Sequence, residues 1–276
     1  MKIVLVVAVL VLIALPAFAG FSVDFPVVAR IQGATTFFYT DITVTNHSDQ
    51  TTNVTFEYIS GDLTVDAFGV LVAGLAPHAS FHQDDFFLFL SNQGFITPAQ
   101  ANAAIGTLLL NFSGATFTTG NEASAVVRTY NYVTPPLRPS IGYAYRGQVL
   151  RQNGKHTVSS VIRNSGTSGV GPQIVTNMGF ENTGFNDAGA VDTTPVTIQL
   201  TFYDGGTGAQ VGPQPSVTLQ SGQITQINDV WTAEGLPAAA NEVLVVGKQT
   251  AGTAQINGYV LFKDVATNDP SFFFMQ

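Results

Sequence analysis

Two short stretches of the chain carry side chains suited to metal binding. In the first, His78 and His82 are four residues apart and Asp84 follows two residues later. Imidazole nitrogens and carboxylate oxygens bind zinc and similar metals, and in an extended segment all three side chains point to one face. Along a strand, however, the two histidines are about 13 Å apart, so a shared ion requires a bend. A strand edge that runs into a polar turn is the simpler interpretation, and a metal site is the alternative.

The second stretch is an oxygen-rich loop that begins at Phe185 and Asn186. Its Asn186, Asp187 and Asp192 make it loosely similar to a calcium loop, but the closing bidentate glutamate of such a loop is absent. A loop rich in Gly, Asn and Asp that needs no ion is therefore the first interpretation, so we expect no cofactor, with calcium as the alternative at this loop. We name Phe185, Asn186, Asp187 and Asp192 as candidate ligand-binding residues.

Motifs of catalysis are missing from the sequence. It contains no Gly-x-Ser-x-Gly elbow, phosphate loop, dinucleotide fingerprint or His-Glu-x-x-His. Glycoside hydrolysis needs only two carboxylates, but five glutamates lie in local contexts that do not suggest a raised pKa: Glu57, Glu122, Glu181, Glu234 and Glu242. From these absences we predict that the protein is not an enzyme. The enzyme alternative would require carboxylates that converge in a cleft between the two domains.

The elements that position these residues are predicted to be strands. Short runs of Val, Ile, Thr, Phe and Tyr alternate with polar residues and are broken by Gly, Pro, Asn and Asp. In the run 53–58, Val54, Phe56 and Tyr58 fall on one face, the pattern of a half-buried antiparallel strand. The fold class is therefore all-β.

Helical signals are confined to two alanine-rich stretches, 97–104 and 236–241. The first has Thr97 in the N-cap position and Pro98 at the first helical position. Consecutive aromatic residues at 37–39, 86–90 and 272–274 are interpreted as extended, which directs some of their rings outward. Trp231 is interpreted as a core residue, with an exposed ring as the alternative.

The same order of segments occurs twice in the chain, which indicates two tandem immunoglobulin-like β-sandwich domains, each with one short helix. We predict domains at 20–150 and 151–276, with the linker between Pro135 and Lys155, because the prolines of 135–139 cannot donate to a sheet. The segments that correspond, first half before second, are 40–46 and 179–182, 53–58 and 196–203, 74–78 and 217–222, 84–85 and 228–229, 98–104 and 237–240, 106–112 and 243–246, and 125–132 and 256–262.

Residues 1–19 are predicted to be a signal peptide, with Lys2 before an apolar run of about 13 residues and a small-x-small site before Gly20. That run is shorter than the roughly 20 residues of a membrane-spanning helix, so an uncleaved anchor is the second interpretation and no membrane span is expected after cleavage. We expect the product to be secreted or at the cell surface, with the periplasm as the alternative.

Composition narrows the class of partner. The chain has no cysteine, only 10% charged residues and a net charge of −8, which becomes −9 when Lys2 leaves with the signal peptide. Stability must therefore come from the core without disulfides. An acidic, cysteine-free chain is not expected to bind nucleic acid or an anionic membrane.

The chain resembles exported bacterial proteins, poorly characterised in function, that carry tandem immunoglobulin-like sandwiches. The resemblance rests on 27–30, 40–46, 75–77, 84–85 and 125–130, and the second half departs from it by having Tyr-Val-Leu-Phe at 259–262 in place of the Arg-Thr-Tyr at 128–130. It implies a fold and a compartment, and it brings no catalytic residues.

Our leading hypothesis is a non-enzymatic structural or adhesive protein that binds itself or a surface glycan or protein. The apolar terminal segments 21–31 and 271–275 suggest strands that complete a neighbour's sheet. The alternative is a binding module for a glycan or peptide that uses the loops 164–172 and 182–194.

Overall fold

The computed structural model describes residues 21–32, 37–117, 122–131, 141–149, 155–164, 174–265 and 270–276. The predicted signal peptide, Gly20, the boundary at 150–151, the proline-rich segment 135–139 and residues 165–172 of the glycine-rich loop lie outside these ranges. The structure is 59% strand and 7% helix, with several antiparallel sheets, which confirms the all-β class. In the described part of the chain, none of the helices is long and apolar enough to cross a membrane.

The first half of the described chain, residues 21–149, forms one sheet that folds back over its own core. Its strand order is β4-β3-β6-β1-β2-β7-β8, with β5 on β2 and β9 on β1. β1 pairs with β6 over most of its length and with β2 only through Ile31 and Gln32, so it passes from one layer to the other. The strands are β1 (Phe21–Gln32), β2 (Phe37–Asn46), β3 (Thr52–Ser60), β4 (Asp66–Leu75), β5 (Ser80–Gln83), β6 (Ala104–Ser113), β7 (Ala123–Asn131), β8 (Ile141–Arg146) and β9 (Gln148–Val149).

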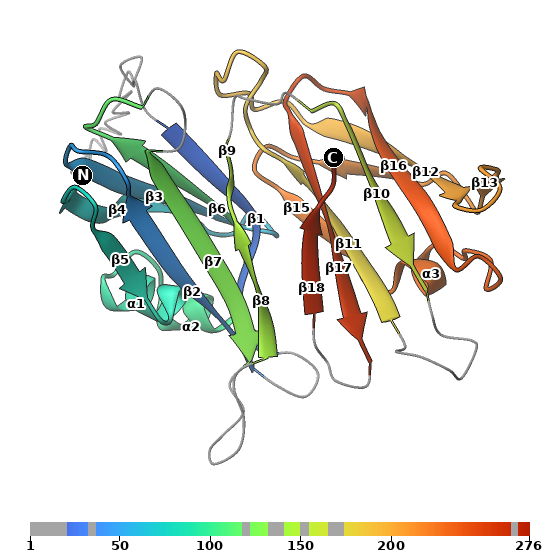
Figure 1. Cartoon of the computed structure of the whole chain (residues 1–276), viewed down its shortest axis with the longest axis horizontal. Coiled ribbons are helices and arrows are strands. Elements are labelled where there is room, and N and C mark those ends of the chain that lie inside the picture. Colours follow the sequence, from blue (N-terminus) through green and yellow to red (C-terminus); the bar gives the residue numbers. More distant parts are fainter. Residues whose placement is uncertain are drawn as a thin grey trace, which may run out of the picture.

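The second half, residues 155–276, forms two sheets around a second core. One has the order β10-β16-β12-β13 with β14 on β12, and the other has the order β15-β11-β17-β18. Figure 1 shows these strands, in yellow to red, beside the blue and green strands of the first half. They are β10 (Thr157–Arg163), β11 (Ile174–Asn182), β12 (Val196–Asp204), β13 (Gln210–Val211), β14 (Ser216–Leu219), β15 (Ile224–Ile227), β16 (Glu242–Ala251), β17 (Ile256–Asp264) and β18 (Pro270–Phe274).

Strand pairing follows the same order in both halves. The series β4-β3-β6-β1 corresponds to β14-β12-β16-β10, and β5-β2-β7-β8 corresponds to β15-β11-β17-β18. A buried asparagine ends the corresponding strands β2 and β11: the side-chain amide of Asn46 donates to the carbonyl of Leu75 (3.1 Å), and that of Asn182 donates to the carbonyl of Leu219 (3.3 Å). Because a buried amide must be hydrogen-bonded, each asparagine fixes the start of the turn that follows its strand.

The helices differ from the sequence prediction in two places. Helix α2 (Pro98–Asn102) is where it was predicted, with a capping box between Thr97 and Gln100. Helix α1 (Phe86–Asn92) replaces the extended aromatic run, because helical spacing buries Phe86, Phe87 and Leu90 together and an N-cap at Asp85 starts the turn. In the second half, α3 (Val230–Ala233) precedes the predicted stretch 236–241, which contains a turn closed from Ala240 to Pro237.

Each half has its own apolar core, but the cores are not independent. Trp231 is buried in the second core, as predicted. Ile224 and Tyr259 come from β15 and β17 of the second half, yet they pack in the core cluster of the first half. β8 and β18 lie side by side where the halves meet (Figure 1).

The two terminal segments both have partners within the chain, so the expectation of free terminal strands is wrong for them. Most of β1 is buried. It pairs with β6 along most of its length, and at Val23 and Asp24 it also pairs with β9. β18 pairs with β17, and the backbone of Gln276 exchanges two hydrogen bonds with Ser159 (2.7 and 2.9 Å). β1 therefore has strand partners on both sides, and β18 has one in β17.

Candidate functional site

A buried pair of carboxyl groups lies where the two halves meet. Alternation along β1 sends Val23 and Phe25 into the first core and Asp24 to the opposite face. In register, Asp24 neighbours Leu109 on β6, which neighbours Glu57 on β3, so the three form a row across the outer face of the sheet. The second half covers this face, and there the hydroxyl of Thr107 donates to the carbonyl of Gly222 (3.4 Å).

Asp24 meets Glu181 and Asn257 from the second half. Asp24 is 3% exposed and Glu181 is 2% exposed. The side-chain amide of Asn257, on β17, donates to Asp24 Oδ2 (2.6 Å) and to Glu181 Oε2 (3.2 Å), and Glu181 lies opposite Asn257 in register on β11. One amide group therefore joins two carboxyls that belong to different halves of the chain.

Burial controls the protonation of this pair. Loss of solvent raises the pKa of Asp24 to about 6, although its hydrogen bonds to Glu181 and Asn257 work in the opposite direction. Burial also holds the pKa of Glu181 well above its usual range, and the neighbouring charge of Asp24 adds to this shift. Neither carboxyl takes part in an ion pair among the described residues. Asp24 is therefore the first of the pair to lose its proton, and Glu181 holds its proton to higher pH and shares it with the Asp24 carboxylate.

A cavity of about 100 Å³ opens beside the pair. Its lining combines acidic, hydroxyl and apolar side chains: Asp24, Glu57, Glu181, Thr107, Leu109 and Phe185. Pockets for small organic ligands usually enclose roughly 300–1,000 Å³. The cavity is therefore too small for a sugar ring or a peptide segment to reach the carboxyls.

The chemistry of the pair follows from this enclosure. Two carboxyls that share a proton are known from hydrolytic sites, where they act on a substrate or water that reaches them. Here both carboxyls are nearly inaccessible and are held by the amide of Asn257. The arrangement can take up or release a proton and change the charge at the contact between the halves.

The local sequence around the glutamates does not indicate that burial raises the pKa of three of them. Burial raises the pKa of Glu57 and Glu234 as well as that of Glu181. For Glu57 the nearby charge of Asp66 adds to the effect. Their burial arises from chain segments distant in sequence, which a local pattern does not contain.

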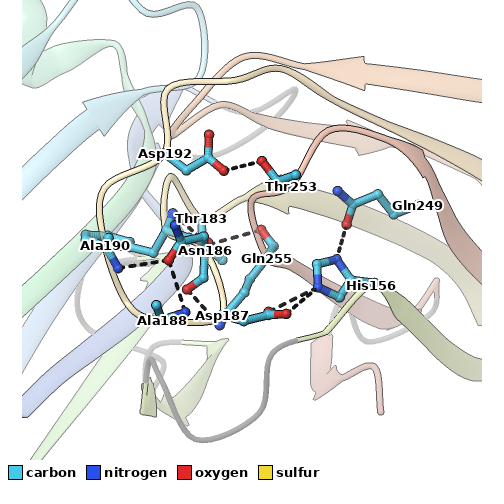
Figure 2. A network of polar contacts seen from close by, with 11 residues as sticks. His156, Thr183, Asn186, Asp187, Ala188, Ala190, Asp192, Gln249, Thr253 and Gln255 are labelled. Atoms are coloured by element: carbon cyan, nitrogen blue, oxygen red, sulfur yellow. Dashed lines mark hydrogen bonds and ion pairs between the residues drawn. The ribbon is translucent and has the colours of Figure 1, made fainter.

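The loop predicted to bind calcium or another ligand is held by its own hydrogen bonds (Figure 2). Asn186 Oδ1 accepts from the backbone N–H groups of Ala188 and Ala190, both at 3.0 Å. Asp192 Oδ2 accepts from the hydroxyl of Thr253 (2.6 Å). The side-chain oxygen of Asn186 therefore closes a turn within the loop, and that of Asp192 joins the loop to the turn between β16 and β17.

Asp187 and Phe185, the other two candidate ligand-binding residues, have different surroundings. The Asp187 carboxylate lies 3.0 Å from His156 Nε2, and Gln249 Oε1 lies 2.6 Å from Nδ1 of the same ring (Figure 2). These two hydrogen bonds raise the pKa of His156, and the hydrogen bond with Gln249 has the larger effect. Phe185 forms an isolated bridge with Val191, and both line the cavity beside the carboxyl pair.

The structure separates the residues predicted to bind a metal. His82 Nε2 lies 2.8 Å from Asp84 Oδ1, and its Nδ1 hydrogen-bonds to Thr43. His78 has a positive φ in a turn and hydrogen-bonds to Asp49 (2.9 Å). Within the described ranges, no three His, Cys, Asp or Glu side chains gather as a metal site.

Sequence reasoning missed Asp24 and Asn257. The available signal was an acidic residue between Val23 and Phe25 in an otherwise apolar strand. Such a residue must face either solvent or a partner surface, and only the arrangement of the two halves decides between them.

Comparisons with known proteins provide no relative from which a function can be transferred: no family model matches the chain, and no curated protein matches it.

Proposed function

We propose that the protein is a non-enzymatic, exported structural or adhesive protein, built from two tandem immunoglobulin-like sandwiches, that associates through the free edge of β4. This keeps the compartment and fold type implied by the resemblance to exported bacterial proteins. It moves the associating edge from the terminal strands to β4.

The observation that carries the proposal is an apolar sheet edge. Among the described strands, β4 pairs only with β3. Phe68 is 73% exposed and Val70 is 54% exposed on this strand. An open edge with exposed apolar side chains is a template for a further strand, which would gain backbone hydrogen bonds and apolar contacts together.

The shape of the edge limits where a strand can add. Residues 66–70 pair with β3 in unbroken register, whereas the remainder of β4 carries register shifts. Irregular pairing protects an edge from further strands, so the regular segment is the available part. Beneath it, the ring of Phe95 packs against Gly69 and is partly exposed. An added strand would therefore contact Phe68 and Val70 on one face and Phe95 on the other.

The test uses a second copy of the chain as the probe. Static light scattering over a concentration series should show self-association of the wild-type protein, and Phe68→Lys with Val70→Lys should yield monomers. Val265→Lys is the matched control, because Val265 is an exposed valine outside any strand. A wild-type protein that remains monomeric, or association that survives the double substitution, would contradict the use of this edge.

A second candidate function is a binding module at the loop 182–194. It is favoured by the hydrogen bonds that hold the loop and by Val191, an exposed apolar side chain on its surface. If the wild-type protein is monomeric, screening glycans and peptides against the wild type and Val191→Lys tests this function. Binding that is indifferent to Val191 would argue against the loop.

A further inference from the structure

We propose that Asp24, Glu181 and Asn257 form a proton-dependent latch between the two halves of the chain. The latch is closed while at least one of the two carboxyls is protonated, and it loosens when both are ionised.

The geometry makes the latch depend on a proton. The amide of Asn257 has two N–H groups, and the structure directs this nitrogen to Asp24 and Glu181. With one proton present, one carboxyl donates to the other and the net charge of the pair is −1. Without it, two negative charges share a buried site, where the Asn257 amide donates to both carboxyls and the backbone N–H of Phe25 donates to Asp24. Like charges at such a distance repel strongly where water is excluded.

Among the residues that the structure describes, none that lines the cavity beside the pair carries a positive charge. β3 contributes Glu57 and, beside it, β4 contributes Asp66, both acidic. β6 contributes Thr107 and Leu109, which carry no charge, and β9 pairs with Asp24 through its backbone.

The acidic side chains of the loop 182–194 in the second half are hydrogen-bonded to other partners. Asp187 bonds to His156, and Asp192 bonds to Thr194 and Thr253. On β15, Gln226 is uncharged and accepts from the hydroxyl of Tyr259 (2.8 Å). A second ionisation of the pair therefore adds to an already negative surface.

The protonation of the two carboxyls sets the pH range. The pKa of Asp24 is raised to about 6, so it ionises first, and the pKa of Glu181 lies well above its usual range. The latch therefore stays closed while Asp24 ionises, and it loosens only when the pH rises far enough for Glu181 to lose its proton as well.

The latch can be tested by measuring distances between the halves. The chain has no cysteine, so spin labels can be attached specifically after Asn92→Cys on α1 and Ala209→Cys beside β13, both exposed. Pulsed electron paramagnetic resonance from pH 5 to pH 10 should give a narrow distance distribution that broadens in one titration step. Circular dichroism at each pH verifies that the strands persist.

Isosteric variants identify the responsible groups. Asp24→Asn should abolish the broadening, because a single carboxylate can be held by two amides, and Glu181→Gln should act in the same way if the first variant folds poorly. Glu57→Gln, a carboxyl in the same cavity but outside the pair, should titrate as the wild type does. An unchanging distribution in the wild type, or a step that persists in both isosteric variants, would overturn the latch.

Discussion

At the scale of single residues, the buried Asp24 should make stability depend on pH. Because its pKa is about 6 in the folded protein and 3.8 as the reference value, the unfolded chain loses this proton first. The contribution of protonated Asp24 to the free energy of unfolding is fully present below pH 4 and is lost as pH rises through about 6. Two pKa units correspond to about 3 kcal/mol in the free energy of unfolding.

Urea unfolding at pH 4 and pH 7 can check this expectation. For each protein, the free energy of unfolding at pH 7 is compared with its value at pH 4. This change from pH 4 to pH 7 should be about 3 kcal/mol more stabilising in Asp24→Asn than in the wild type. Glu57→Gln is the control for a carboxyl in the same cavity. Equal pH dependence of the wild type and Asp24→Asn would show that Asp24 is not buried as described.

Residue types were easier to predict than residue partners. Asn186 and Asp192 were named as candidate ligand-binding residues from their oxygen atoms, and in the structure these oxygens accept hydrogen bonds from Ala188, Ala190 and Thr253. Asp24 and Glu181 lie in different halves of the chain and meet only through packing. No local pattern contains that contact, so the carboxyl pair required the structure.

At the scale of elements, Asp85 shows how one side chain fixes several segments. Its carboxylate accepts from the N–H of Leu88 at the start of α1 and from Arg30 Nε of β1 at 2.9–3.0 Å. Arg30 in turn lies over the ring of Phe37 and contacts Asn102 of α2. The side chains of Arg30 and Asp85 are only 12% and 17% exposed, so this ion pair is sheltered from water.

We predict that Asp85→Ala lowers the free energy of unfolding by roughly 2–4 kcal/mol, since it removes a cap and leaves Arg30 without its carboxylate. Asp229 is the matched control, because it occupies the same position before α3 and caps through the N–H of Thr232. Asp229→Ala should lose the cap and the hydrogen bond from the Thr232 hydroxyl and place alanine at a φ of 45°, a loss of about 1–2 kcal/mol without any effect on the Arg30 pair. Chemical denaturation compares the two, and equal losses would contradict the role of the Arg30 pair.

The order of elements was predictable from the sequence, whereas their exact type was not. Corresponding segments such as 40–46 and 179–182 do occupy the same place in the strand order, on β2 and β11. The aromatic run that begins at Phe86 was misassigned because periodicity over five residues cannot separate a strand from one helical turn. The cap at Asp85 was the overlooked signal.

At the scale of the whole molecule, the two halves are joined by apolar packing as well as by the carboxyl pair. Tyr259 is fully buried in the first core cluster although β17 belongs to the second half. Its ring stacks on Phe272 (5.2 Å between centroids) and covers Gly179, which has no side chain to obstruct it. Shared core residues couple the stability of the two halves.

We therefore expect the wild type to unfold in one calorimetric transition at neutral pH. Tyr259→Ala should lower the free energy of unfolding by about 3–5 kcal/mol, as removal of a large buried ring usually does, and should separate the unfolding of the halves into two transitions. Tyr203→Ala, at a half-buried tyrosine on β12, is the control and should leave a single transition. Two transitions in the wild type at neutral pH would contradict the coupling.

Alkaline solution should produce the same separation without any substitution at Tyr259, because ionisation of both Asp24 and Glu181 opposes the packing that the tyrosine supports. The two effects can be distinguished: Asp24→Asn should restore a single transition at alkaline pH, whereas it cannot replace the apolar ring that Tyr259→Ala removes. Calorimetry of the wild type, both single variants and the double variant at pH 6 and pH 9 measures this difference. Two transitions in Asp24→Asn at pH 9 would mean that a group other than the carboxyl pair separates the halves.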